Sequence, residues 1–92
     1  MRFDWSDAKS ASLKEERDVS FEDVVFHVAA GSLLDVLDHP RPEAYPGQQV
    51  MVVDIEGYAF VIPFVTDGDV WFLKTIIPSR KMTKHYLGGA DS

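Results

Sequence analysis

Apolar positions recur at helical spacing at the start of the chain. Trp5, Ala8 and Leu13 are separated by polar residues, which predicts a short helix over roughly residues 5–17. A second helix is expected from Ser20, a favourable N-cap, to Gly31, which ends it. Its predicted buried face carries Phe21, Val24, Val25, Val28 and Ala29.

The pattern then changes from helical spacing to strands. Four segments rich in β-branched and aromatic residues follow, at 33–37, 50–55, 58–65 and 70–77. Glu56-Gly57 and Asp67-Gly68 separate the last three segments and predict tight hairpin turns. Because Pro63 cannot donate to a strand ladder, we expect a bulge or an unpaired position there.

A proline–serine break precedes the last predicted element. Pro78 ends the fourth strand, and Ser79 caps a helix over residues 80–87 that Gly88-Gly89 stops. The order is therefore two helices, four strands as an antiparallel meander, and one helix. This order predicts a single α+β domain over residues 1–92.

The composition is that of a small globular domain, with 46% hydrophobic and 26% charged residues. The chain has no cysteine, which fits a reducing cytoplasm. No apolar run approaches the roughly 18 residues of a membrane span, and the N-terminal segment lacks a signal-peptide pattern. We therefore expect a cytoplasmic protein without a membrane partner. The three histidines lack metal-ligand spacing and no Gly-rich phosphate loop is present, so we expect no metal and no cofactor.

The charges are distributed unevenly along the chain, because the positive side chains gather near the C-terminus. Residues 70–92 contain four Lys or Arg and one Asp, whereas the whole chain has a net charge of −6. Arg80 and Lys81 fall in the first turn of the last predicted helix, where each cation costs about 0.3–1 kcal/mol against the helix dipole. Residues that violate a local preference, as cations at the start of a helix do, often have a function. We therefore expect an anion site here, to which Lys74 on the preceding strand also contributes. An RNA phosphate is the natural ligand of such a site. Two other interpretations explain the basic residues equally well: they form a solvated helix face, or they pair with acidic residues elsewhere in the chain.

His85 is the candidate for proton transfer in this region. It follows Lys81 by one helical turn, and histidine changes its charge near neutral pH. A histidine in the last turn also simply stabilises a helix, which is the alternative reading. Acidic residues such as Asp35 and Asp54 fall mostly at strand ends and turns, where solvation explains them.

The chain opens with FDWSDAKSASLKEERDVSFEDV and closes its last strand and helix with IIPSRKMTKHY. Both segments resemble the corresponding segments of the BrnT-type toxins. The resemblance implies a ribonuclease toxin of a bacterial type II toxin–antitoxin pair with a RelE-like fold. It also implies metal-independent RNA cleavage, in which the ribose 2′-hydroxyl attacks the adjacent phosphate. The positions that carry over are Arg80, Lys81, Thr83 and Lys84 in the last helix, and Lys9 and Arg17 near the first.

Side-chain chemistry then indicates roles for the candidate residues in such a cleavage. Arg80 would hold the scissile phosphate, Lys81 or Lys74 would assist, and His85 would transfer a proton. The expected RNA contacts are Lys84, Thr83, Lys9 and Arg17. The expected protein partner is a small antitoxin, itself DNA-binding, that covers this region through an acidic or apolar segment.

The chain also departs from these toxins. Glu16-Arg17-Asp18 stands where the family usually has Lys-His-Gly, and the last helix is cut short. One alternative is therefore a catalytically silent relative that uses the same basic residues to hold a protein partner. Another is a housekeeping RNA-binding domain, although few aromatic residues accompany the cations.

Overall fold

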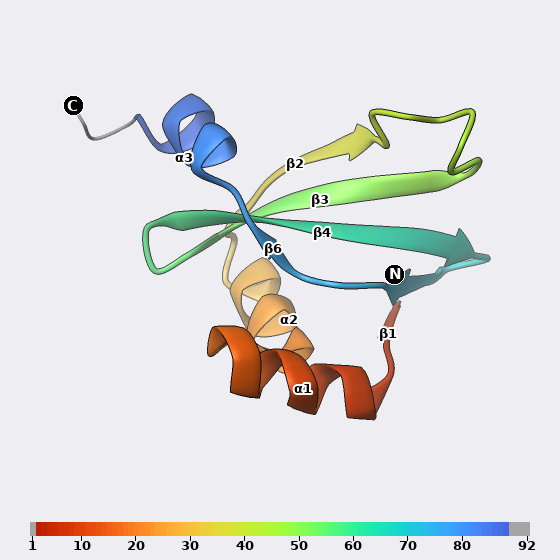
Figure 1. The fold of residues 1–92 in the computed structure, drawn as a ribbon, viewed down its shortest axis with the longest axis horizontal. Coiled ribbons are helices and arrows are strands. Elements are labelled where there is room, and N and C mark those ends of the chain that lie inside the picture. The colour runs from red at the N-terminus through yellow and green to blue at the C-terminus, as the bar shows by residue number, and fades with distance from the viewer. Residues whose placement is uncertain (1, 89–92) are drawn as a thin grey trace.

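Six strands form one sheet within residues 2–88, the part of the chain that the computed structural model describes, and three helices pack on it (Figure 1). The strands are β1 (Arg2–Asp4), β2 (Leu33–Asp38), β3 (Gln48–Ile55), β4 (Tyr58–Asp67), β5 (Val70–Leu73) and β6 (Ile77–Pro78). The helices are α1 (Asp7–Arg17), α2 (Phe21–Ala29) and α3 (Arg80–Leu87). The α+β class expected from the sequence is confirmed.

The sheet is mixed rather than purely antiparallel. Its strand order is β1-β5-β4-β3-β2, and β6 pairs with β4 beside β5. Strands β2 to β5 are antiparallel neighbours in chain order, whereas β1 adds to β5 in parallel. The sequence did not predict β1, because its three residues are too few for a periodic pattern.

The expected strand over residues 70–77 is broken into β5 and β6, and Pro63 explains the break. Strand β4 pairs with β5 through Phe64 to Asp67 and with β6 through Phe60 and Val61. Between these pairings, the carbonyl of Pro63 accepts a hydrogen bond from the Lys74 N–H at 2.8 Å. In a strand, the backbone N and O of one residue point toward the same neighbouring strand. The donor that Pro63 lacks would therefore also have faced the segment at Lys74. The expected bulge in β4 is absent; the ladder is interrupted in the segment opposite instead.

Local sequence signals set the helix starts and the first hairpin. Ser20 and Asp23 form a capping box at α2, with side chain-to-backbone bonds of 2.9 and 3.1 Å. Glu56 and Gly57 both have positive φ, 55° and 86°, as a two-residue hairpin turn requires. In the second hairpin, Gly68 and Asp69 connect β4 to β5. Gly88 caps α3 with φ 80°, and Gly89, expected to stop the helix with it, lies outside the described residues.

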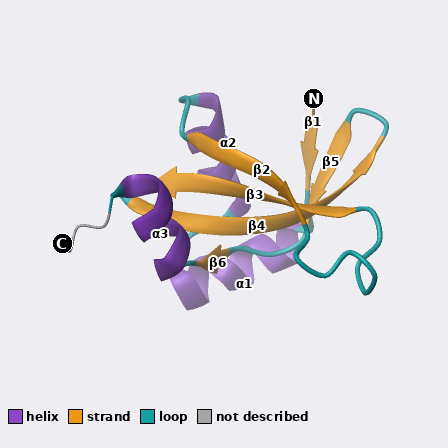
Figure 2. Ribbon diagram, turned by 90° about the horizontal axis from the view of Figure 1, so that it is seen from above, coloured by secondary structure: helices purple, strands orange, loops and turns teal. Residues whose placement is uncertain are grey.

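Helices α1 and α2 cover one face of the sheet, and α3 lies on the other (Figures 1 and 2). The core forms under α1 and α2, where Leu13, Phe21 and Val24 pack with Phe64 and other buried strand residues. None of the helices described within residues 2–88 has the length and apolar character that a membrane crossing requires. The fold thus leaves α3 alone on its face, with one side against the sheet and the other toward solvent.

Candidate functional site

Three hydrogen bonds fix the start of α3 on strand β4. The Ser79 N–H donates to the Ala59 carbonyl at 3.0 Å, and the Ala59 N–H donates to Thr83 Oγ1 at 2.8 Å. Thr83 Oγ1 in turn donates to the Ser79 carbonyl at 2.7 Å. Ser79 also caps the helix, because its Oγ accepts the Met82 N–H at 3.1 Å. The expected Ser79 cap is confirmed, and these bonds decide which side of α3 faces solvent.

The solvent-facing side of α3 carries all of its basic side chains. Arg80, Lys81, Lys84 and His85 are exposed, whereas Met82, Thr83, Tyr86 and Leu87 are half-buried. At about 100° per residue, the four exposed positions fall within an arc of about 140°. No acidic residue lies in the first turn of the helix. We call this surface, made by Arg80, Lys81, Lys84 and His85, the basic face.

A groove separates α3 from strand β2. It has a volume of about 530 Å³, and its lining consists of Leu37, Lys81, Met82, Lys84, His85 and Tyr86. Leu37 lies on the α3 side of the sheet, because it is paired with Val50 and alternates with Val36, which packs against the core under α2. The α3–β2 groove therefore borders the basic face along its length.

Asp35 links strand β2 to the last turn of α3, a role that sequence reasoning missed. Its Oδ2 accepts the Tyr86 hydroxyl at 2.6 Å, and its Oδ1 accepts the Val36 N–H at 2.8 Å. The Tyr86 hydrogen bond, the Val36 N–H and the nearby charge of His85 lower the pKa of Asp35, although burial opposes them. The same hydrogen bond, together with burial and the Asp35 charge, raises the pKa of Tyr86. The two residues are 51 positions apart in the chain, so no local pattern signals the contact.

The Asp35–Tyr86 bond predicts a pH-dependent effect of Tyr86→Phe. An aspartate with a lowered folded-state pKa stabilises the fold above its unfolded value of about 3.9, and this contribution is lost as the pH falls through the folded-state pKa. We expect Tyr86→Phe to lower stability at neutral pH and to have a smaller effect once the pH has fallen below the folded-state pKa of Asp35. Urea unfolding of both proteins at neutral pH and over a series of acidic pH values measures this; a difference that does not shrink with falling pH would contradict the assignment.

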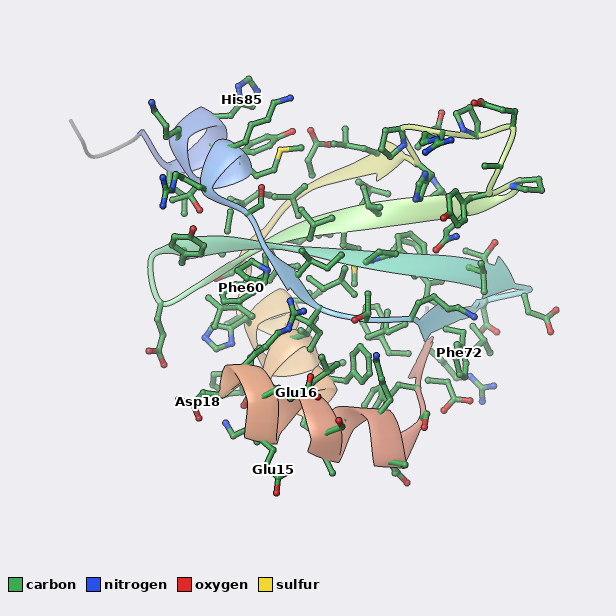
Figure 3. The ribbon with its side chains drawn as sticks, viewed as in Figure 1. Glu15, Glu16, Asp18, Phe60, Phe72 and His85 are labelled. Carbon is green, nitrogen blue, oxygen red and sulfur yellow. The ribbon has the colours of Figure 1, made fainter. Side chains whose placement is uncertain are left out.

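Lys74 does not join the basic face. Its ammonium lies 5.5 Å from the centroid of the Phe72 ring, and Figure 3 places Phe72 at the β1–β5 end of the sheet, away from His85 on α3. The backbone contacts agree, because Lys74 bonds Pro63 whereas Ser79 bonds Ala59. Those two β4 positions are four residues apart, or about 13 Å at about 3.3 Å per residue.

Lys9 and Arg17 lie on α1, across the sheet from the basic face. Lys9 is exposed on the first turn of that helix. Arg17 ends the helix, and its Nη1 donates to the Ile76 carbonyl at 3.0 Å, which ties α1 to the irregular segment between β5 and β6. Arg17 also borders a second pocket of about 370 Å³, where carboxylates such as Asp18 and Glu56 are mixed with the cations. Figure 3 shows Asp18 and Phe60 at that end of the molecule.

Thr83 faces the sheet rather than solvent, so its hydroxyl serves the fold. Replacement by valine keeps the shape but leaves the buried Ala59 N–H without a partner, which costs about 1–3 kcal/mol. We expect Thr83→Val to lower the free energy of unfolding by that amount, and Thr83→Ser, which keeps the hydroxyl, to lower it less. Urea titration of the three proteins provides the comparison. Unchanged stability in Thr83→Val, with a loss only in Thr83→Ser, would mean that the methyl group and not the hydrogen bond holds α3.

The site gives no sign of a metal centre within the described part of the chain. Among residues 2–88, His, Asp and Glu side chains form no group of three that could hold a metal ion. Comparison of the chain with protein-family models, with curated proteins and with solved structures finds no match. The residues themselves therefore carry the functional argument.

Proposed function

We propose that this chain is a ribonuclease of the RelE-like type that acts as the toxin of a bacterial type II toxin–antitoxin pair. The proposal joins the resemblance of both chain ends to the BrnT-type toxins with the geometry of α3. It places the protein in the cytoplasm, with messenger RNA as substrate and no metal or cofactor. Its protein partner is a small DNA-binding antitoxin.

The observation that carries the proposal is the basic face. Four exposed basic side chains share one arc of a helix in a chain of net charge −6. The half-buried side of the same helix is held by Thr83 and Tyr86, so the helix keeps its cations on the side that faces solvent. A cluster of cations at one place suits the recognition of a single phosphate group better than a diffuse positive charge does.

The chemistry needs only side chains of the basic face. Arg80 binds two oxygens of the scissile phosphate, and Lys81 and Lys84 neutralise the charge that grows on them. His85 accepts the proton of the ribose 2′-hydroxyl as its oxygen attacks phosphorus. The bond from phosphorus to the 5′-oxygen breaks, that oxygen takes a proton from Lys81 or water, and a 2′,3′-cyclic phosphate remains. Lys74, Lys9 and Arg17 lie elsewhere and take no part in this step.

A second candidate function is a catalytically silent module that binds a protein. The observation that favours it is the α3–β2 groove, because Leu37, Met82 and Tyr86 offer apolar contact area beside the cations. In this case the basic face would steer an acidic partner rather than hold RNA. The two functions differ in one outcome, which is whether RNA is cut.

Induced expression in bacteria tests the proposal. The wild-type chain is expected to arrest growth and to shorten messenger RNA, and co-expression of the neighbouring antitoxin should restore growth. The combined variant Arg80→Ala, Lys81→Ala, Lys84→Ala is expected to be harmless, because it removes the phosphate contacts from exposed positions.

A matched control separates the effect of losing the basic face from the effect of losing positive charge anywhere on the protein. Arg2 and Arg41 are exposed arginines that lie outside α3, so Arg2→Ala with Arg41→Ala should arrest growth as the wild type does. Growth that continues with intact RNA when the wild-type chain accumulates would end the ribonuclease proposal and favour the binding module.

A further inference from the structure

The α3–β2 groove combines an apolar floor with a positive rim. Apolar contact comes from Leu37, Met82 and the ring of Tyr86. The rim is formed by Lys81, Lys84 and His85, all exposed. The groove has a volume of about 530 Å³ and is open to solvent along one side, so it would leave part of any small ligand uncovered. The shape therefore suits the edge of a larger partner.

The floor favours a protein side chain over a nucleotide. The side chains of Leu37 and Met82 offer a base edge or a ribose no hydrogen-bond donor, and their one acceptor is the weak thioether sulfur of Met82. Tyr86 is half-buried and its hydroxyl is bonded to Asp35 at 2.6 Å, so it is not free to turn outward as a stacking platform. Aliphatic or aromatic side chains of a protein would instead gain burial there.

The rim favours an acidic partner. Among residues 2–88, none of the side chains that line the groove is acidic. Asp35 is bonded to Tyr86 of the groove lining, and both of its carboxylate oxygens already accept hydrogen bonds. The ion pairs found within residues 2–88 join Lys14 to Asp18 and Asp23, far from this groove. Lys81 and Lys84 are thus available for carboxylates of another chain.

We infer that the α3–β2 groove is a docking site for an acidic amphipathic segment of a partner protein. Its apolar side chains rest on Leu37 and Met82, and its carboxylates pair with Lys81 and Lys84. Because Lys81, Lys84 and His85 belong to the basic face as well, the docked segment covers part of the surface that RNA would use. This blocking effect rests on the proposed function, whereas the docking itself does not.

A synthetic peptide tests the docking. The probe is an amphipathic peptide of about 15 residues, long enough to form a helix, with leucines on one side and glutamates on the other. Nuclear magnetic resonance should show shifts of the Leu37 and Met82 methyl signals on addition of the peptide. A scrambled peptide of the same composition, and one with lysine in place of glutamate, should leave those signals unchanged.

Charge-reversed variants supply the quantitative test. Lys81→Glu with Lys84→Glu should weaken peptide binding about tenfold or more, since two exposed ion pairs of up to about 1 kcal/mol each become repulsions. Arg2→Glu with Arg41→Glu alters the net charge equally and should leave the affinity within about twofold. Both pairs are exposed, so the variants are expected to fold.

Each contrary outcome has a distinct meaning. If the methyl signals respond to a single-stranded RNA oligonucleotide and not to the acidic peptide, the groove is a nucleic-acid surface and the inference is wrong. The inference is also wrong if neither probe shifts them. Peptide binding by a chain that never cuts RNA would uphold the docking site and end the ribonuclease proposal. Cleavage that continues at saturating peptide would overturn the blocking effect alone.

Discussion

Phe64→Ala is expected to lower the free energy of unfolding by about 3–5 kcal/mol, the usual cost of truncating a buried phenylalanine. The Phe64 side chain has no exposed area, and its ring stacks on Trp71 with centroids 4.3 Å apart and planes 5° from parallel. A domain of this size has a net stability of only about 5–15 kcal/mol. The variant should therefore be close to the limit of folding, which urea titration followed by circular dichroism would show.

Phe26 provides the matched control for that prediction. It is also a phenylalanine, but 68% of its side chain is exposed on α2. Phe26→Ala should change the stability by no more than about 0.5 kcal/mol, as surface substitutions usually do. Similar losses in the two variants would mean that the core does not form under α1 and α2 as described.

Under the proposed ribonuclease function, Arg80→Ala is expected to reduce the rate of RNA cleavage by about 100- to 1,000-fold, with little change in stability. This is the range seen when one donor to a developing oxyanion is removed. Arg80 is exposed at the first position of α3 and makes none of the bonds that dock the helix, so its loss should not unfold the site. Single-turnover cleavage of a labelled RNA, with thermal unfolding as the check on the fold, measures both effects.

Two further arginine variants make the result specific. Arg80→Lys keeps the charge but loses the bidentate geometry, so its rate should fall between those of the wild type and the alanine variant. Arg41→Ala removes an exposed arginine outside α3 and should cleave at the wild-type rate. If Arg80→Ala and Arg41→Ala cleave equally well, Arg80 does not bind the scissile phosphate.

Local signals in the sequence predicted most of the secondary structure. Ser20 and Ser79 begin helices, and Glu56-Gly57 turns the first hairpin, because caps and tight turns depend on neighbouring residues alone. Strand β1 was missed because it is short and gains its order from pairing with β5, which lies far along the chain. Such pairing leaves no periodic trace in the strand itself.

The break between β5 and β6 shows how a residue in one strand shapes another. The sequence over residues 70–77 is apolar enough for a continuous strand. Pro63 was expected to disturb its own strand, yet β4 stays regular against β3 and the disturbance falls on the segment at Lys74. A proline removes a hydrogen bond to only one of the two strands beside it. Which of the two is affected depends on strand register, which sequence patterns do not reveal.

Within the candidate site, the sequence predicted the basic residues of the last helix but not the hydrogen bonds that hold this helix on the sheet. Arg80, Lys81 and His85 were predicted as catalytic and Lys84 as an RNA contact, and helical periodicity brings these four to one exposed arc. Thr83 was expected to contact RNA, but its side chain bonds the backbone of Ala59, 24 residues away. Long-range hydrogen bonds of this kind arise from the packing of α3 on the sheet.

The charged residues outside α3 show the same limit. Lys74 is close to Arg80 in the chain, yet its side chain turns to Phe72, and Arg17 bonds the carbonyl of Ile76. Asp35, which we had explained by solvation, accepts the Tyr86 hydroxyl and holds the last turn of α3. Residues close together in the chain can have side chains that point to different parts of the sheet. Their spacing in the sequence therefore does not predict which partner a long side chain contacts.

The end groups of RNA exposed to the purified chain decide whether the basic face cuts RNA as proposed. A defined single-stranded RNA is incubated with the protein in the presence of a metal chelator, and the products are separated and their ends identified. We predict fragments with 2′,3′-cyclic phosphate and 5′-hydroxyl ends from the wild type, and intact RNA from Arg80→Ala under the same conditions. Intact RNA with the wild-type protein, or equal cleavage by both proteins, would contradict the claim.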